Sequence, residues 1–273
     1  MSPTRRSPGP ARCSRARRSR FLAEDLFDRP AAWRLDAVER LGLVGEERIA
    51  GLITGAGYPD ALVPLLSGLS HEHGLVCDVG AGLGAATWWL GSQAAVDVIG
   101  VEPEPAAAEL ARRAFPDLPV VSGEAAALPL GDGSCTGVAL LGVLSLLGDA
   151  EAGATIGEAH RVLRPGGRIG ITDLCALVDD RQWADGPNVF RSTASLTSML
   201  DRHGWMVQGV AAQPADLATS WDPFGEQVDD EIARRHGGSK AFEEWRADRQ
   251  HLGQLIADGR LEVGTLVAVV QGP

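Results

Sequence analysis

Short apolar runs alternate with helical patterns along the middle of the chain. The apolar runs lie at residues 74–80, 96–102, 118–123, 135–144 and 168–174. Runs of this length without polar alternation are typical of strands buried on both faces of a parallel sheet. A strand, a helix and a further strand in repeated order require right-handed crossovers. The pattern therefore predicts a mostly parallel sheet covered by helices.

The helices between these strands have recognisable ends. "AATWWLGSQ" follows the first strand, and "PEPAAAELARRAF" opens with Pro103, where proline is favoured at a helix start. A third helix is predicted from the capping residue Asp149 to the breaker Pro165-Gly166-Gly167.

The two ends of the chain extend this pattern. Residues 21–70 are predicted to be helical, with a short or kinked helix around Pro64. A helix at 192–203, a strand "WMVQGVAA", a helical stretch at 226–258 and a last strand "VGTLVAVVQ" follow the fifth strand. The predicted fold class is α/β: a doubly wound, mostly parallel, seven-stranded Rossmann-like sheet with an N-terminal helical prefix and a helical lid insertion before the last strand.

Composition and charge narrow the class of partner. The 273 residues carry a formal net charge of −11, and the first 20 residues contribute seven arginines and no acid, so the remainder carries −18. We interpret residues 1–20 as a disordered basic arm. The acidic remainder argues against nucleic-acid binding, because most of the surface would repel a polyanion. No apolar run approaches the ~18 residues that span a bilayer. A small-molecule partner and a cytoplasmic location are expected.

A glycine-rich segment follows the first strand. Gly80, Gly82 and Gly84 lie at its carboxyl end, where ligands bind in open parallel sheets. The segment satisfies G-x-G-x-x-A, and Glu102 follows Gly82 by 20 residues, at the end of the next strand, where it can grip ribose hydroxyls. A dinucleotide, S-adenosylmethionine and a tight turn without a ligand all remain compatible with this segment.

Asp78 favours one of these alternatives. It ends a strand that is otherwise apolar, where a carboxylate is costly without a partner. S-adenosylmethionine offers an ammonium group and a sulfonium charge, whereas the pyrophosphate of a dinucleotide would be repelled. The alternative is an aspartate that only ties the loop to a neighbouring backbone N–H.

Four segments in order carry a family resemblance. "LVCDVGAGLG", "VIGVEPEP", "VSGEAAALPLGDGSCTGVALLGVL" and "AHRVLRPGGRIGITDL" resemble the motif series of class I S-adenosylmethionine-dependent methyltransferases over residues 74–174. The branch that is most similar includes ubiquinone/menaquinone C-methyltransferases and small-molecule tailoring enzymes of actinobacterial natural product pathways. The resemblance implies S-adenosylmethionine as cofactor, S-adenosylhomocysteine as product and no metal.

The resemblance also implies roles for individual residues. Glu102 would bind the ribose, Pro103 would lie against the adenine, and Glu124, where relatives have aspartate, would accept from the adenine amino group. The implied cofactor-binding set is Asp78, Gly80, Ala81, Gly82, Gly84, Glu102, Pro103, Gly123, Glu124, Ala125, Leu141, Gly142 and Tyr58.

The catalytic residues are less clearly marked. Relatives often carry a Glu-His pair after the fourth strand, but this chain has Ser145 and Leu146 there. Asp173 lies at the carboxyl end of the fifth strand, and His251 lies in the predicted lid, so these two are the candidates for a general base. His160 and His203 are expected to pack or to lie at the surface.

The acceptor is expected to be a small apolar or aromatic molecule. Its walls are predicted in the lid regions, from Trp183, Trp221, Trp245, Phe190 and Phe224. Residues 21–273 are interpreted as one domain: a helical cap (21–73), a cofactor-binding core (74–174), an acceptor and lid region (175–258) and a closing strand (259–273). Alternative functions are a cyclase that uses the cofactor as a fixed charge, an NAD-dependent oxidoreductase and a binding module without catalysis. The oligomeric state stays open.

Overall fold

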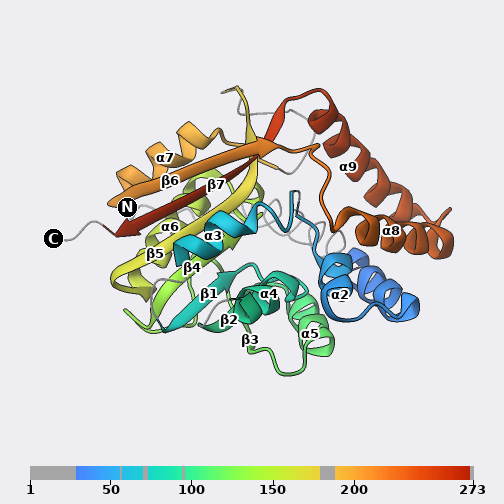
Figure 1. Ribbon diagram of the computed structural model, residues 1–273, viewed down its shortest axis with the longest axis horizontal. Coiled ribbons are helices and arrows are strands. Elements are labelled where there is room, and N and C mark those ends of the chain that lie inside the picture. The colour runs from blue at the N-terminus through green and yellow to red at the C-terminus, as the bar shows by residue number, and fades with distance from the viewer. Residues whose placement is uncertain (1–28, 56, 70–72, 94–95, 179–187, 271–273) are drawn as a thin grey trace, which may run out of the picture.

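The computed structural model describes residues 29–270, apart from residue 56 and residues 70–72, 94–95 and 179–187. The predicted basic arm, Cys13, His71 and Trp183 lie outside these residues. In the described residues, seven strands form one sheet in the order β3-β2-β1-β4-β5-β7-β6 (Figure 1). Their bounds are β1 Leu75–Val79, β2 Asp97–Glu102, β3 Val120–Ser122, β4 Cys135–Leu141, β5 Leu163–Ala176, β6 Trp205–Pro214 and β7 Leu261–Val270.

The strand directions agree with the predicted α/β class. Strands β1 to β5 pair in parallel, and β7 pairs antiparallel with both β5 and β6. The sequence therefore predicted the doubly wound, Rossmann-like sheet correctly. The chain reverses its order between β1 and β4, and such a reversal opens a crevice at the carboxyl ends of the strands.

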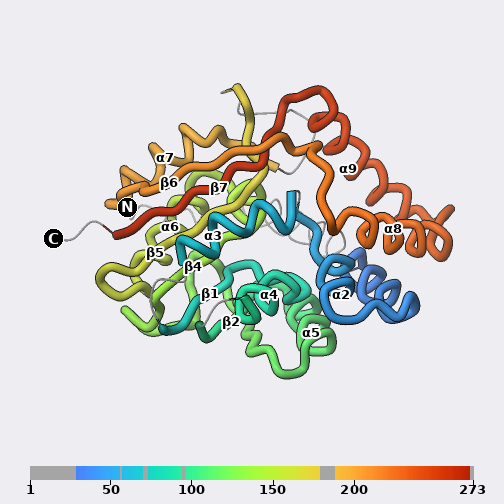
Figure 2. The backbone as a smooth tube through the Cα atoms, viewed as in Figure 1, coloured from blue at the N-terminus to red at the C-terminus, as the bar shows by residue number. Residues whose placement is uncertain are grey.

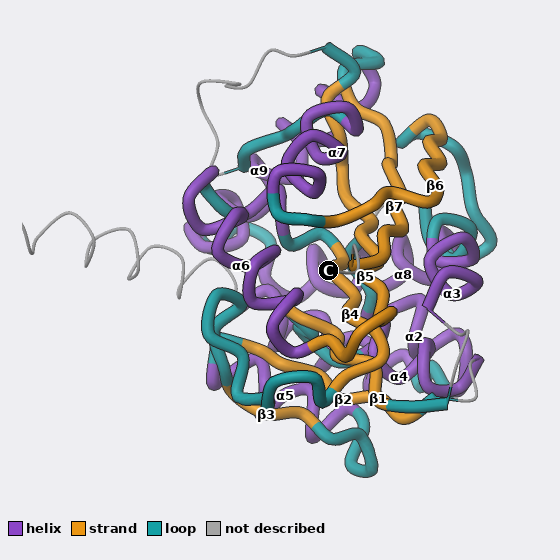
Figure 3. The backbone as a smooth tube through the Cα atoms, turned by 90° about the vertical axis from the view of Figure 1, so that its left-hand side faces the viewer, coloured by secondary structure: helices purple, strands orange, loops and turns teal. Residues whose placement is uncertain are grey.

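Helices cover both faces of the sheet (Figure 3). Helices α3, α4 and α5 pack over one apolar cluster, and α6 and α7 pack over another on the opposite face. The bounds are α3 Leu62–Leu69, α4 Ala85–Gln93, α5 Pro105–Ala114, α6 Asp149–Val162 and α7 Thr193–Arg202. Helix α5 starts at Pro105, two residues after the predicted start, because β2 runs on to Glu102 and a turn follows it.

The predicted prefix and insertion meet beyond the carboxyl ends of the strands. A helical segment at 29–41 and α2 (Gly45–Leu52) form the prefix, and α8 (Asp222–His236) and α9 (Lys240–Ala257) form the insertion. Helix α8 packs beside α2 although the two are far apart in the sequence (Figure 2). The predicted single helical stretch at 226–258 is divided at Gly237 and Gly238, where Gly238 has a φ of +85°.

A buried arginine joins the prefix to the insertion. Arg34 donates to the Gly51 carbonyl at 2.8 Å and to the Asp229 carboxylate on α8. Burial lowers the pKa of Arg34, and the charge of Asp229 opposes that effect. Because the guanidinium stays charged, it needs both partners in its buried position.

Three further results concern the sheet and the surface. Cys77, Cys135 and Cys175 are buried free thiols. In the described part of the chain, no helix is long and apolar enough to cross a membrane. The division of residues 21–273 into cap, core, acceptor region and closing strand stays a prediction.

Candidate functional site

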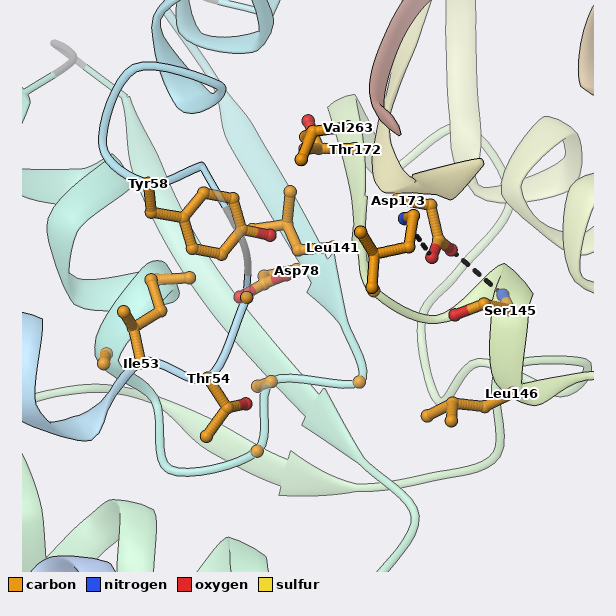
Figure 4. Close-up of a pocket in the computed structure, with 18 of the residues that line it drawn as sticks. Ile53, Thr54, Tyr58, Asp78, Leu141, Ser145, Leu146, Thr172, Asp173 and Val263 are labelled. Carbon is orange, nitrogen blue, oxygen red and sulfur yellow. Dashed lines mark hydrogen bonds between the residues drawn. The ribbon is translucent and has the colours of Figure 1, made fainter. Parts of the chain in front are cut away.

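A cavity of about 310 Å³ opens at the carboxyl ends of β1, β4 and β5 (Figure 4). Its walls come from the loop after α2, the glycine loop, the turn after β4, the end of β5 and the lid. The lining residues are Leu52, Ile53, Thr54, Gly55, Tyr58, Asp78, Gly80, Ala81, Gly82, Leu83, Ala85, Ala86, Leu141, Gly142, Ser145, Leu146, Thr172, Asp173, Leu174, Asn188, Phe190, Leu252 and Val263.

Asp78 is the buried acid on the β1 side of the cavity. Its Oδ2 accepts a hydrogen bond of 2.6 Å from Thr87 on α4, while its Oδ1 is buried and has no hydrogen-bond partner among the described residues. Burial raises the pKa of Asp78 to about 7; the hydrogen bond from Thr87 opposes this shift, and the charge of Glu102 adds to it. A buried acceptor oxygen without a donor is costly, and a bound ligand would offset that cost.

The glycine loop turns its backbone amides away from the cavity. The amides of Gly80 and Ala81 donate to the Val101 carbonyl, and the amide of Gly82 donates to Glu102 Oε2 at 2.7 Å. Gly82 has a φ of +53°, and a Cβ built on it would meet no atom within 4 Å. The loop thus presents an open backbone surface rather than a ring of donors.

Gly84 has a different surrounding from Gly82. A Cβ on Gly84 would approach Leu118 at 2.9 Å and Ala111 on α5 at 3.4 Å, so this glycine allows the backbone just before α4 to lie close to α5 and to the segment after it. Gly84 does not line the cavity, although it was predicted to contact the cofactor. We interpret it as a packing residue.

The residues predicted to bind ribose and adenine lie farther along the same edge of the sheet. Glu102 ends β2 and pairs with Ser122 at the end of β3, so Pro103 and the segment Gly123–Ala125 follow neighbouring strands. Both oxygens of Glu102 accept backbone hydrogen bonds, from Gly82 and from Glu104. Glu124 is exposed. None of these residues lines the cavity, which covers only the β1, β4 and β5 part of the edge.

Leu141 and Gly142 form the wall opposite the glycine loop. Gly142 has a φ of +68°, and its amide donates to the Thr172 carbonyl at 2.8 Å. No atom lies within 4 Å of a Cβ built on this glycine. The two open glycines, Gly82 and Gly142, therefore stand at two sides of one cavity.

Asp173 is the second buried acid, at the end of β5. Its Oδ2 accepts from the Ser145 amide at 3.0 Å, and its Oδ1 accepts from the Leu174 amide at 2.8 Å. Burial raises the pKa of Asp173, although the hydrogen bonds from Ser145 and from the Leu174 amide lower it in part. In Figure 4 this carboxylate lies beside Ser145, across the cavity from Asp78.

The turn after β4 is held by a buried arginine. The turn η1 (Leu144–Leu146) places Ser145 against Asp173, and the Ser145 carbonyl accepts from the Val189 amide at 2.6 Å. Arg191 donates to the Leu144 carbonyl at 2.6 Å and also to Leu147 and Asp149. Sequence reasoning did not identify Arg191, because one arginine in a loop carries no local signal.

Tyr58 lies beside Asp78, on the side of the cavity away from Asp173 (Figure 4). It is buried on the loop that follows α2, and burial together with the charges of Asp173 and Asp78 raises its pKa. Its ring extends over Asp78 toward Leu141 (Figure 4). The hydroxyl therefore stays protonated and can donate within the cavity.

The histidines considered in the sequence do not reach the cavity. His251 is exposed on α9 and does not line the cavity; its neighbour Leu252 does. His160 packs edge-on against Trp205, and His203 contacts the Met199 carbonyl, so neither reaches the site.

Among the described aromatic residues that were predicted as acceptor walls, only Phe190 lines the cavity. Trp221 is buried against Trp89 and donates to Glu46 at 3.0 Å. Trp245 packs on Trp33. These tryptophans fix the prefix to the insertion because their rings meet in the seam between the two segments.

Several lining residues had no signal in the sequence. Thr87 does not line the cavity but donates to Asp78, and it could have been noticed as a hydroxyl in the first turn of a helix that follows an acidic strand end. Ile53, Thr54 and Asn188 lie in loops, and only the three-dimensional fold brings them to the cavity. No group of three or more His, Cys, Asp or Glu residues in the described ranges is arranged to hold a metal ion.

Known proteins resemble this chain in sequence and in fold. Residues 77–171 match the methyltransferase domain family. Curated relatives from Mycobacterium tuberculosis and Mycobacterium bovis, named as uncharacterized methyltransferases, are 35% identical over 113 residues. The match covers 41% of this chain and 44% of each relative, so it spans less than half of the length of these relatives.

Solved structures resemble a larger part of the chain. The cyclase SpnF aligns with a TM-score of 0.63 and 18% identity over 84% of this chain and 92% of its own. Phosphoethanolamine N-methyltransferase 2 of Haemonchus contortus, in complex with S-adenosyl-L-methionine, aligns with a TM-score of 0.60 and 15% identity over 81% of this chain and 54% of its own. At these identities the likeness shows the fold alone. Residues 77–171 thus match the methyltransferase domain family, and the chain has the Rossmann-like fold of methyltransferase structures.

Proposed function

We propose that this protein transfers a methyl group from S-adenosylmethionine to a small-molecule acceptor bound in the cavity. The observation that carries the proposal is the buried Asp78 Oδ1, which has no hydrogen-bond partner in the described structure and lines the same cavity as the open backbone of Gly82. A ligand with an ammonium group and a sulfonium charge fits this position, since it satisfies the oxygen and neutralises the carboxylate.

The remaining roles follow the edge of the sheet. We assign the methionine end to Asp78, Gly80, Ala81, Gly82, Leu141, Gly142 and Tyr58, the ribose to Glu102, and the adenine to Pro103 and Gly123–Ala125. The order of the strands supports this assignment, because β1, β2 and β3 are neighbours and their carboxyl ends form one continuous edge.

The chemistry needs little covalent help from the protein. S-adenosylmethionine supplies a methyl group on sulfur; an acceptor lone pair forms the new bond to the methyl carbon while the carbon–sulfur bond breaks and leaves its electron pair on S-adenosylhomocysteine. The chain's own residues hold the acceptor in line and exclude water. Asp173 accepts the proton that a hydroxyl acceptor releases, since its raised pKa makes it a stronger base than an exposed aspartate.

Two features argue against the dinucleotide alternative. The amides of Gly80, Ala81 and Gly82 are directed toward β2, so they are not available to a pyrophosphate. The carboxylate of Asp78 would also repel that group. The cyclase alternative differs only in the reaction, and it predicts cofactor binding without consumption.

Calorimetry with S-adenosylmethionine, S-adenosylhomocysteine and NADH tests the proposal. We expect micromolar binding of the first two and none of NADH; binding of NADH alone would refute the assignment. Mass spectrometry of reactions with metabolite extracts then distinguishes methyl transfer, which forms S-adenosylhomocysteine, from a cyclase or a binding module, which does not.

A single substitution tests the proposed ribose contact. Glu102→Ala should weaken S-adenosylmethionine binding by about 1.5–3 kcal/mol, the size of a lost charged hydrogen bond. Glu104→Ala is the matched control, because it removes a neighbouring carboxylate and keeps the backbone amide of residue 104 that donates to Glu102. Unchanged affinity in Glu102→Ala would show that the ribose lies elsewhere.

A further inference from the structure

The charged side chains that line the cavity indicate which class of acceptor it can bind. This inference rests on the proposed function. We propose that the acceptor is an apolar molecule, neutral or cationic, that presents a hydroxyl or amino hydrogen to Asp173, and that carboxylated and phosphorylated acceptors are rejected. No comparison with known proteins assigns this selectivity.

The described lining of the cavity contains two acids and no base. Asp78 and Asp173 are its charged side chains, and no lysine, arginine or histidine is among the described residues that line it. The nearby Arg191 is held by the carbonyls of Leu144 and Leu147 and by Asp149. An anion placed in the cavity would therefore meet negative charge without a compensating cation.

The two acids have separate tasks. Asp78 has one oxygen without a donor and lies beside the glycine loop, so the cofactor's positive charge neutralises it. Asp173 remains for the acceptor, and the amides of Ser145 and Leu174 fix its orientation. Tyr58 lies near both acids. A donor on the acceptor would complete the hydrogen bonding of Asp173, because an ionised carboxylate has about four acceptor positions.

Four apolar side chains line this side of the cavity, together with the polar residues Ser145, Thr172 and Asn188. Leu146, Leu174, Phe190 and Leu252 come from the turn after β4, from β5, from the segment before α7 and from α9. Leu146 is 43% exposed, so it lies at the mouth of the cavity. An apolar acceptor body covers these side chains, while its polar hydrogen points inward to Asp173.

A panel of ring compounds tests this selectivity by ligand-observed NMR. Each ring scaffold is used in four forms, with a hydroxyl, an amine, a methyl ether or a carboxylate, and the protein is measured with and without saturating S-adenosylhomocysteine. We expect the hydroxyl and amine forms to bind at least tenfold more tightly than their carboxylate and methyl ether partners. Equal or tighter binding of carboxylates, or of methyl ethers, would overturn the proposal.

Variants separate this inference from a general effect of charge. Asp173→Asn should reduce the discrimination against carboxylates at least tenfold, whereas Asp201→Asn, which removes the same charge from an exposed position on α7, should not. Leu146→Arg adds a cation at the exposed mouth and should tighten carboxylate binding at least tenfold, independently of the buried hydrogen bonds of Asp173. Unchanged selectivity in Asp173→Asn and Leu146→Arg would overturn the proposal.

Calorimetry and the ligand panel together distinguish a failure of the proposed function from a failure of the proposed acceptor class. If S-adenosylhomocysteine does not bind in calorimetry, the proposed function fails, whatever the panel shows. If it binds and the carboxylate forms are preferred, the proposed function stands and the acceptor class is wrong.

Discussion

Asp78 and Asp173 are both buried acids of one cavity, but their surroundings differ. Asp78 receives one side-chain donor, Thr87, and leaves the other oxygen without a partner. Asp173 receives backbone amides on both oxygens. The hydrogen bonding of the aspartate is therefore incomplete on the glycine-loop side of the cavity, whereas both oxygens of the aspartate on the β5 side have donors.

This difference indicates two functions. A buried oxygen without a hydrogen bond destabilises the folded protein, and a ligand that donates to it removes this free-energy cost. Asp78 therefore suits a binding role. A carboxylate held by backbone amides keeps its position while its proton comes and goes, so Asp173 suits a role in positioning and proton transfer. Each of the following predictions tests one side of this contrast.

The largest expected effect concerns Asp173. Asp173→Asn should slow methyl transfer to a hydroxyl acceptor about 10²–10⁴-fold, since the variant cannot accept the proton. S-adenosylmethionine affinity should stay within about twofold, because the side chain lies on the acceptor side. Single-turnover kinetics and calorimetry measure the two quantities separately. A matched loss of both would assign Asp173 to the cofactor instead.

The second prediction concerns the titration of Asp78. Its pKa is raised to about 7 in the folded protein, against about 3.9 in the unfolded chain. The folded state thus keeps a proton that the unfolded state has released, and this stabilisation is full below about pH 4 and is lost as the pH rises through about 7. The groups that face this carboxyl are Thr87, Glu102 and Tyr58.

Asp78→Asn removes this titration. Between about pH 5 and about pH 8 the wild type should lose about 2.5 kcal/mol of unfolding free energy relative to the variant, because each unit of pKa difference contributes about 1.4 kcal/mol. Urea unfolding at both values measures the difference. Parallel curves for the two proteins would mean that Asp78 is ionised throughout this range.

The same contrast shows what could be predicted from the sequence. The apolar runs, the glycine loop and Asp78 lie in one continuous stretch of the chain, so local pattern predicted the strands and placed Asp78 beside the glycine loop. That this side of the cavity binds a cofactor stays a prediction. Gly84 shows the limit even there: its place in the pattern resembles that of Gly82, yet it packs against α5.

The acceptor side could be predicted only in part. Asp173 was identified from its place at a strand end. Its partner Ser145 lies before α6 and β5 in the sequence, and Arg191, which holds the turn around Ser145, lies in the segment after β5, so no local pattern connects the three residues. The tryptophans were assigned to the acceptor because of their position in the lid, and the structure uses Trp221 and Trp245 to join α8 and α9 to the prefix. Sequence pattern marks an aromatic side chain but not the direction in which it points.

A third prediction tests the support of the Asp173 side. Arg191→Met removes the guanidinium that donates to the carbonyls of Leu144 and Leu147, so it should cost about 2 kcal/mol of unfolding free energy. Because η1 also orients Asp173, kcat should fall more than KM rises. Arg191→Lys, which keeps one donor group, should recover part of both effects. Urea unfolding and steady-state kinetics measure them, and a change in stability alone would limit Arg191 to a structural role.

The smallest expected effect concerns His251. It was a candidate base in the sequence, but it is exposed on α9 and lies outside the lining of the cavity, whereas the adjacent Leu252 lines it. His251→Ala should therefore change the activation free energy of the reaction and the free energy of unfolding by less than about 0.5 kcal/mol each, as is usual for surface substitutions. A pH–rate profile is the decisive measurement, because the profile of His251→Ala should coincide with that of the wild type. A loss of the acidic limb in His251→Ala, with that limb retained in Asp173→Asn, would transfer the proton acceptor from the sheet to the lid.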